Sequence, residues 1–316
     1  MSVSGARPVE VADGAALRSA QRLEVRSRWL MVAPALAILL FAAVGPLAIM
    51  IVYSFLAPGP YGGVVWEFST EAWFRVLFQR DIFDGTVSLA DAHLSIFWRS
   101  VKLSLMTTAL ALALGFPTAY FIATQPPRAR GLWLFLITIP FWTSYLLRVF
   151  AWKIVLGYNG VVNASLMELG IIAQPLEFLL YNVNSVVITL AHAWAPFAIL
   201  PIFVSLEKID RSLLEAATDL GDGPLRRFLR VTLPLSLPGV VAAALIVFIP
   251  TVGDYVTPHL VGGKNGLMIA NMIQVQFGKA NDWPLGAALA VSTMLIVTAA
   301  SLLFVAFAKQ LSTRFR

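Results

Sequence analysis

Long uncharged runs alternate with short polar segments along the whole chain. Crossing the ~30 Å hydrocarbon layer of a membrane takes roughly 20 apolar residues. Because backbone groups in lipid must pair within their own segment, such runs predict helices. Six candidate spans are Trp29–Phe55, Leu103–Thr124, Gly131–Leu147 (extending past Arg148 to about Leu156), Val183–Leu206, Leu237–Gly253 (extending to about Leu260) and Pro284–Ala308. We therefore expect an all-α, polytopic membrane protein with six transmembrane helices.

Composition agrees with this class. Of the 316 residues, 59% are hydrophobic and 13% are charged, and the mean hydropathy is +0.79. Soluble domains carry about 25% charged residues. We interpret the net charge of +6 as a sign of how the chain is oriented in the lipid membrane. We do not interpret it as a sign of nucleic-acid binding.

The distribution of Lys and Arg predicts the orientation. With the N-terminus inside, the inner segments carry fifteen of the 23 basic residues and the outer loops carry four. Both termini are then cytoplasmic. The expected organisation is a largely disordered cytoplasmic leader at 1–28, a six-helix transmembrane domain at 29–308 and a cytoplasmic tail at 309–316. Within the domain, residues 207–236 form a long basic inner loop.

This loop has the pattern of two short helices with a sharp break. Either Ser212, in a capping box with Glu215, or Asp210 would cap the first helix. The Gly221-Asp222-Gly223-Pro224 segment breaks the chain, and Pro224 suits the first turn of a second helix. That helix, 225–231, would carry Arg226, Arg227 and Arg230 on one side and Leu225, Phe228 and Leu229 on the other. On the simplest interpretation Glu215 only caps a helix and the arginines only satisfy the charge bias.

A specific motif favours a further role for this loop. Glu215-Ala216-Ala217, Gly221, Val231, Leu233 and Pro234 have the spacing E-A-A-x3-G-x9-I-x-L-P, with Val231 in place of Ile. The loop is similar to the EAA loop, by which inner-membrane permeases of ABC importers dock on their ATPase. The resemblance implies a type I ABC importer permease fold and a coupling helix that lies in a groove on an ATPase dimer, where Gly221 permits the reversal and Glu215 pairs with a basic or polar group. The coupling residues that it implies are Glu215, Ala216, Ala217, Gly221, Arg226, Arg227, Leu233 and Pro234. We call residues 207–236 the coupling loop.

The chain itself carries no nucleotide-binding motif. The P-loop pattern G-x4-G-K-[ST] is absent, and Gly262-Gly263-Lys264-Asn265 has neither its spacing nor its hydroxyl residue. ATP and Mg²⁺ are therefore expected on the partner ATPase, with no cofactor in this chain and no enzyme activity of its own. There are no cysteines, and His93, His192 and His259 lie in different segments, so no metal site is predicted.

The resemblance extends over roughly 29–307. Residues 140–152, PFWTSYLLRVFAW, are similar to the P-x-W-T-S-x-L-x-R-x-Y-A-W segment of spermidine/putrescine permeases. The match continues in Asn159–Asn163, Phe248–Tyr255, Leu260–Gly263 and Asn281–Pro284. The chain resembles the first permease subunit of such importers, although related permeases handle opines, other amines or organic anions.

This resemblance implies partners in the bacterial inner membrane and outside it. A second, homologous permease would complete the pore. A periplasmic solute-binding protein would deliver a polyamine to the outer loops, Ala57–Trp98, Gly157–Asn182 and Val261–Trp283.

Ammonium groups are recognised by carboxylates and by aromatic faces, the latter contributing about 0.5–2 kcal/mol each. Asp254 is the one acid that adjoins the interior of a predicted span, and acids there are functional candidates. Tyr255, Trp142, Tyr145 and Trp194 are the aromatic candidates for the solute path. Alternatively, Asp254 lies beyond the end of its span and caps or pairs locally, and the aromatic residues pack or lie in interfacial belts. Arg148 would repel a dication and is interpreted as structural or snorkelling.

Two other classes compete with an ABC permease. An ion-coupled secondary transporter would need acids inside its spans, where Asp254 is the sole candidate. An intramembrane aspartyl protease would need a second such Asp, and a zinc protease would need H-E-x-x-H. The sequence provides neither.

Overall fold

The computed structural model describes the backbone of residues 14–81 and 84–314. It divides into two compact units, Met1–Val52 and Tyr53–Arg316. The first unit consists of most of helix α1, Gly14–Ser54, whose part from Met31 is long and apolar enough to cross a membrane. The expectation of a disordered leader is wrong for residues 14–28, because a stretch rich in Ala, Leu, Arg, Gln and Glu favours a helix that continues into the span. Residues 1–13 lie outside the described part.

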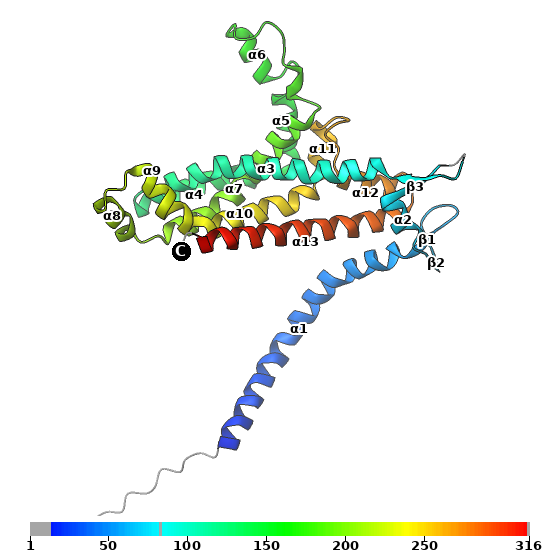
Figure 1. Cartoon of the computed structure of the whole chain (residues 1–316), viewed down its shortest axis with the longest axis horizontal. Helices are drawn as coiled ribbons and strands as arrows, with labels where there is room; N and C mark the ends of the chain where they lie inside the picture. The colour runs from blue at the N-terminus through cyan, green and yellow to red at the C-terminus, as the bar shows by residue number, and fades with distance from the viewer. Residues whose placement is uncertain (1–13, 82–83, 315–316) are drawn as a thin grey trace, which may run out of the picture. The chain divides into compact units, whose positions relative to one another are not determined.

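Four long helices run side by side in the second unit (Figure 1). They are α3 (Asp91–Thr124), α7 (Val183–Glu207), α10 (Leu233–Val252) and α13 (Trp283–Arg314). Helix α7 packs against both α3 and α10 and is the most buried of the candidate spans. Four of the predicted spans are thereby confirmed. Helix α3 begins twelve residues before the predicted Leu103, because Asp91–Lys102 continues the helix on the outer side, where Phe97 and Ser100 are buried.

The third predicted span is broken. Helix α4 (Pro127–Thr138) continues as the 3₁₀ turn η1 (Ile139–Trp142), and α5 (Tyr145–Val155) follows after a bend of 86°. Pro140 lacks the N–H that an α-helix needs, and Thr143 and Ser144 have extended backbones between the two helices. Within the described residues, five helices could cross a membrane, or six if the bent pair counts as one span.

Small elements cover the end of this bundle opposite the coupling loop (Figure 1). Antiparallel pairs join β1 (Leu56–Pro58) to β2 (Val64–Phe68) and β3 (Phe78–Arg80) to β4 (Val87–Leu89). Helix α2 spans Glu71–Leu77, and its Arg75 forms a 2.7 Å ion pair with Asp282. The remaining short elements are α6 (Val161–Glu168), η2 (Glu177–Leu179), α11 (Val256–Val261) and α12 (Ile269–Gly278), and α6 projects away from the bundle beyond α5 (Figure 1).

The opposite end carries the coupling loop. Its helices α8 (Arg211–Asp219) and α9 (Pro224–Arg227) lie at the same end of the bundle as the last turns of α13 (Figure 1). A π-helical turn, η3 (Phe228–Thr232), joins α9 directly to α10. The second helix of the loop is therefore continuous with a membrane span, whereas the sequence predicted a separate helix at 225–231.

Candidate coupling loop and solute path

The first helix of the coupling loop is capped by Asp210. Its carboxylate accepts a 3.0 Å hydrogen bond from the backbone N–H of Ser212. Hydrogen bonding to Ser212 holds the pKa of Asp210 below its usual value, so the cap is a carboxylate at neutral pH. The Ser212–Glu215 capping box is wrong, because α8 begins at Arg211 and Asp210 occupies the capping position.

The chain reverses at Gly221. The N–H of Asp222 donates to the carbonyl of Ala217 at 3.0 Å, and the N–H of Gly221 donates to the carbonyl of Thr218 at 2.9 Å. This is a Schellman motif, which requires a left-handed residue, and Gly221 has φ +86°. The break predicted at this glycine is confirmed.

Two arginines hold the second helix against the first. Arg227 Nη1 donates to Thr218 Oγ1 at 3.0 Å, and Arg230 Nη1 forms a 3.2 Å ion pair with Asp222 Oδ1. Phe228 packs edge-on against Phe116 and Tyr120 of α3. The reversal is therefore fixed by side-chain contacts on both of its sides.

Apolar side chains of the loop remain exposed. Leu220 is 86% exposed and Leu225 is 70% exposed, and Leu213 and Leu229 are also exposed. Of the apolar side predicted for the second helix, Phe228 packs inward and the two leucines do not. Within α8, Ala216 is exposed and Ala217 is buried. Leu233 and Pro234 form the first turn of α10. The loop thus presents an apolar surface at its tip.

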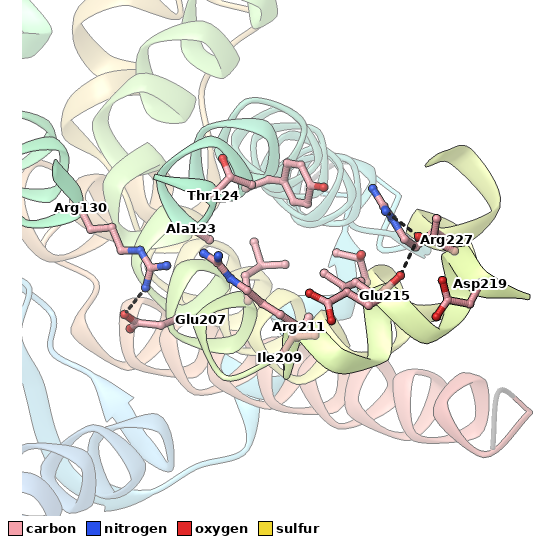
Figure 2. Close-up of a pocket in the computed structure, with 14 residues that line it drawn as sticks. Ala123, Thr124, Arg130, Glu207, Ile209, Arg211, Glu215, Asp219 and Arg227 are labelled. Carbon is pink, nitrogen blue, oxygen red and sulfur yellow. Dashed lines mark hydrogen bonds and ion pairs between the residues drawn. The ribbon is translucent and has the colours of Figure 1, made fainter. Parts of the chain in front are cut away.

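A cavity of about 500 Å³ lies between this loop and the ends of the membrane helices. Figure 2 shows Glu215 and Arg211 on the face of α8 that lines the cavity, together with Asp219 and Arg227. An ion pair at 3.0 Å joins Arg130 of α4 to Glu207, the last residue of α7. This pair was not predicted, although Arg130 and Glu207 lie at the ends of two predicted inner loops.

Asp254 lies just beyond the end of α10. One carboxylate oxygen accepts the N–H groups of Val256, at 2.8 Å, and Thr257, at 3.1 Å. The other accepts the hydroxyl groups of Tyr145 and Thr257. Asp254 therefore caps the start of α11, as the local alternative predicted, and it also joins α11 to Tyr145, the first residue of α5, which was not predicted.

The aromatic candidates for the solute path lie in three different surroundings. Tyr255 is 47% exposed beside Asp254, and its carbonyl accepts from Asn271. Trp194 and Tyr145 pack against one buried cluster, which includes Leu103, Val149 and Leu190. Trp142 is 75% exposed and packs edge-on against Phe135, so the structure does not bring it into this group.

Some polar groups near Asp254 were not predicted. Thr257 donates to Asp254, and Asn271 donates to the carbonyl of the neighbouring Tyr255. The spacing of Asp254 and Thr257, three residues apart as in a helix cap, is the signal that could have revealed Thr257. The guanidinium group of Arg148 lies 4.4 Å from the ring centre of Phe141, which fits the structural role expected for it. No group of three or more His, Cys, Asp or Glu suited to a metal ion occurs in the described part of the chain.

Comparison with known proteins places the chain in a family. Residues 111–316 match the family "Binding-protein-dependent transport system inner membrane component". The chain is 38% identical over 205 residues to the spermidine/putrescine transport system permease protein PotB of Escherichia coli K12, covering 65% of this chain and 74% of that one. PotB of Haemophilus influenzae is 38% identical over 213 residues, covering 67% and 73%. The inner membrane ABC transporter permease protein YdcU of Escherichia coli K12 is 30% identical over 233 residues, covering 70% and 72%.

The fold also matches a solved structure. A chain of a bacterial ABC transporter involved in the import of the polysaccharide alginate superposes with a TM-score of 0.63 at 17% identity, covering 93% of this chain and 98% of that chain. This likeness confirms the predicted six-span, type I importer fold. The chain belongs to the multi-pass inner-membrane permeases of binding-protein-dependent ABC importers.

Proposed function

We propose that this chain is the first permease subunit of a polyamine importer. It lines the path of putrescine or spermidine together with a second, homologous permease. A periplasmic binding protein delivers the solute to the outer loops at 57–98, 157–182 and 261–283. A separate ATPase dimer binds ATP and Mg²⁺ and supplies the energy, so this chain needs no cofactor and catalyses no reaction.

The observation that carries the coupling role is the tip of the coupling loop. A reversal fixed by Gly221 and two arginine contacts leaves Leu220 and Leu225 exposed at the tip of the loop. Clustered exposed leucines next to charged groups are typical of a protein-binding surface. Glu215, Arg226 and Arg227 supply the charge for an ATPase groove.

The end of the bundle that carries the coupling loop also supports an orientation of the chain in the membrane. The coupling loop and the last turns of α13 lie together (Figure 1), and both carry the basic residues typical of the cytoplasmic side. This supports a cytoplasmic C-terminus and, with six spans, a cytoplasmic N-terminus.

The relatives favour polyamines as the solute, and the site around Asp254 suits them. A carboxylate beside the rings of Tyr145 and Tyr255 offers an ion pair and a cation–π contact to an ammonium group. In this conformation both oxygens of the Asp254 carboxylate accept hydrogen bonds. A solute ammonium would therefore replace the Tyr145 contact, and with it the link between α5 and α10.

The deciding experiment is ATP hydrolysis by the complete complex in lipid, with its binding protein. The panel contains putrescine, spermidine, an opine and a dicarboxylate. Stimulation by a polyamine that is lost with Glu215→Ala supports both the solute and the coupling role. Stimulation only by the opine or the dicarboxylate contradicts the polyamine assignment, and normal stimulation of Glu215→Arg contradicts the coupling role.

A further inference from the structure

Arg130 occupies an unusual position at the cytoplasmic end of the bundle. It lies in the first turns of α4, and its side chain is 17% exposed. Nε donates to the backbone carbonyl of Gln125 at 2.8 Å, and Nη1 donates to Glu207 Oε1 at 3.0 Å (Figure 2). Because the guanidinium fork is planar and rigid, two bonds in different directions fix its position.

These bonds connect three helices at one point. Gln125 follows the last residue of α3, so the first bond closes the turn between α3 and α4. Glu207 ends α7, three residues before Asp210 caps α8. The second bond therefore ties α4 to the chain that leads directly into the coupling helix.

The other end of α4 leads to the solute path. From Pro127 the helix and its 3₁₀ extension run to Trp142, a rod of about 24 Å at 1.5 Å per residue. Beyond the bend, Tyr145 contacts Asp254 through its hydroxyl group. The rod thus lies between two polar contacts, one with the coupling loop and one with the end of α10.

We propose that the Arg130–Glu207 ion pair is the positioning contact through which movement of the coupling loop reaches the broken span. When the ATPase displaces α8, Glu207 pulls on the start of α4, and the rod shifts Tyr145 relative to Asp254. The proposal rests on the coupling role proposed above. It adds a residue pair outside the EAA motif that determines how much transport accompanies each ATP hydrolysed.

A purely structural ion pair would behave differently. The loss of a structural ion pair lowers the stability of the folded complex, and with it the amount of complex, and leaves the coupling of the remaining complex unchanged. A positioning contact instead changes the ratio of solute imported to ATP hydrolysed at a constant amount of complex. That ratio separates the two roles.

The test uses the complete complex in lipid vesicles with its binding protein, measuring putrescine uptake and ATP hydrolysis together. We expect Arg130→Glu and Glu207→Arg each to lower uptake per ATP about tenfold, within the usual range of coupling between sites. The double variant, Arg130→Glu with Glu207→Arg, restores the ion pair in reverse and should recover most of the ratio. Arg128→Glu, an equal charge change at an exposed neighbour, should leave the ratio unchanged.

A milder variant covers the case in which charge reversal prevents assembly. Glu207→Gln keeps the size of a half-exposed side chain and removes its charge, and it should lower the ratio severalfold with a normal amount of complex. An unchanged ratio in Glu207→Gln, or no recovery in an assembled double variant, would overturn the proposal. Glu215→Ala in the same assay separates the two proposals. If Glu215→Ala behaves as wild type, the coupling role of the loop is contradicted. If Glu215→Ala loses coupling but the Arg130 and Glu207 variants behave as wild type, only the positioning role is contradicted.

Discussion

Gly221 and Gly223 lie two residues apart in the coupling loop but differ in backbone conformation. Gly221 has φ +86° and Gly223 has φ −67°. A Cβ atom at either position would meet open space. Any difference between substitutions at the two sites must therefore come from the backbone and not from crowding.

Gly221→Val should consequently reduce uptake strongly, because a left-handed conformation costs an L-residue about 1–2 kcal/mol. Gly221→Asn should retain much more activity, since Asn tolerates this region. Gly223→Ala is the matched control and should resemble wild type. Solute uptake at equal membrane levels measures all three, and equal activity of the Val and Asn variants would contradict the role of the reversal.

One substitution can separate the capping contacts of Asp254 from the electrostatic role proposed for it. Asp254→Asn keeps an acceptor oxygen for the N–H groups of Val256 and Thr257 but removes the negative charge. Because charge-assisted hydrogen bonds are about twice as strong as neutral ones, the polyamine concentration for half-maximal uptake should rise about tenfold. Asp84→Asn, an exposed acid in an outer loop, serves as the control. An unchanged half-maximal concentration would assign Asp254 to capping alone.

At the scale of elements, the crossing of α7 and α10 depends on Gly239. A Cβ atom there would lie 2.5 Å from the carbonyl oxygen of Pro201 and would also overlap Ser205. Backbone atoms cannot yield as a flexible side chain can, so the two helices would have to separate.

Gly239→Ala should therefore lower the thermal unfolding midpoint of the purified complex, since overpacking costs about 1–3 kcal/mol. Gly131→Ala on α4 introduces the same methyl group into open space and should leave the midpoint unchanged or raise it. A midpoint for Gly239→Ala equal to that of wild type would show that the crossing can relax.

The apolar runs predicted the helices well where the ends of a run coincide with the signals that start and stop a helix. Val183–Leu206 lies within one residue of α7 because Asn182 caps its start and charged residues follow its end. The bend after Trp142 was not predicted, since Pro140 alone cannot distinguish a kink from a break. The Tyr145–Asp254 and Arg130–Glu207 contacts join residues 109 and 77 positions apart, and local patterns carry no information on such pairings.

At the scale of the whole molecule, the chain contains no cysteine, so each introduced cysteine is a unique label for its topology. Ser88→Cys, exposed on β4, should react with a membrane-impermeant maleimide in intact spheroplasts. Leu220→Cys, exposed at the tip of the coupling loop, should react only after the membrane is opened. Labelling of Leu220→Cys from outside would reverse the proposed orientation.

The π-helical turn at 228–232 makes the coupling loop sensitive to the deletion of a single residue. A π turn accommodates one residue more than an α turn, and one residue corresponds to a rotation of about 100° around a helix. Losing a single codon there would let the turn close as an α-helix and rotate Arg226 and Arg227 around the axis of α10. The length of this short segment therefore sets the direction in which Arg226 and Arg227 point, because an in-frame deletion would turn the proposed docking surface away from the ATPase while every residue of that surface remained.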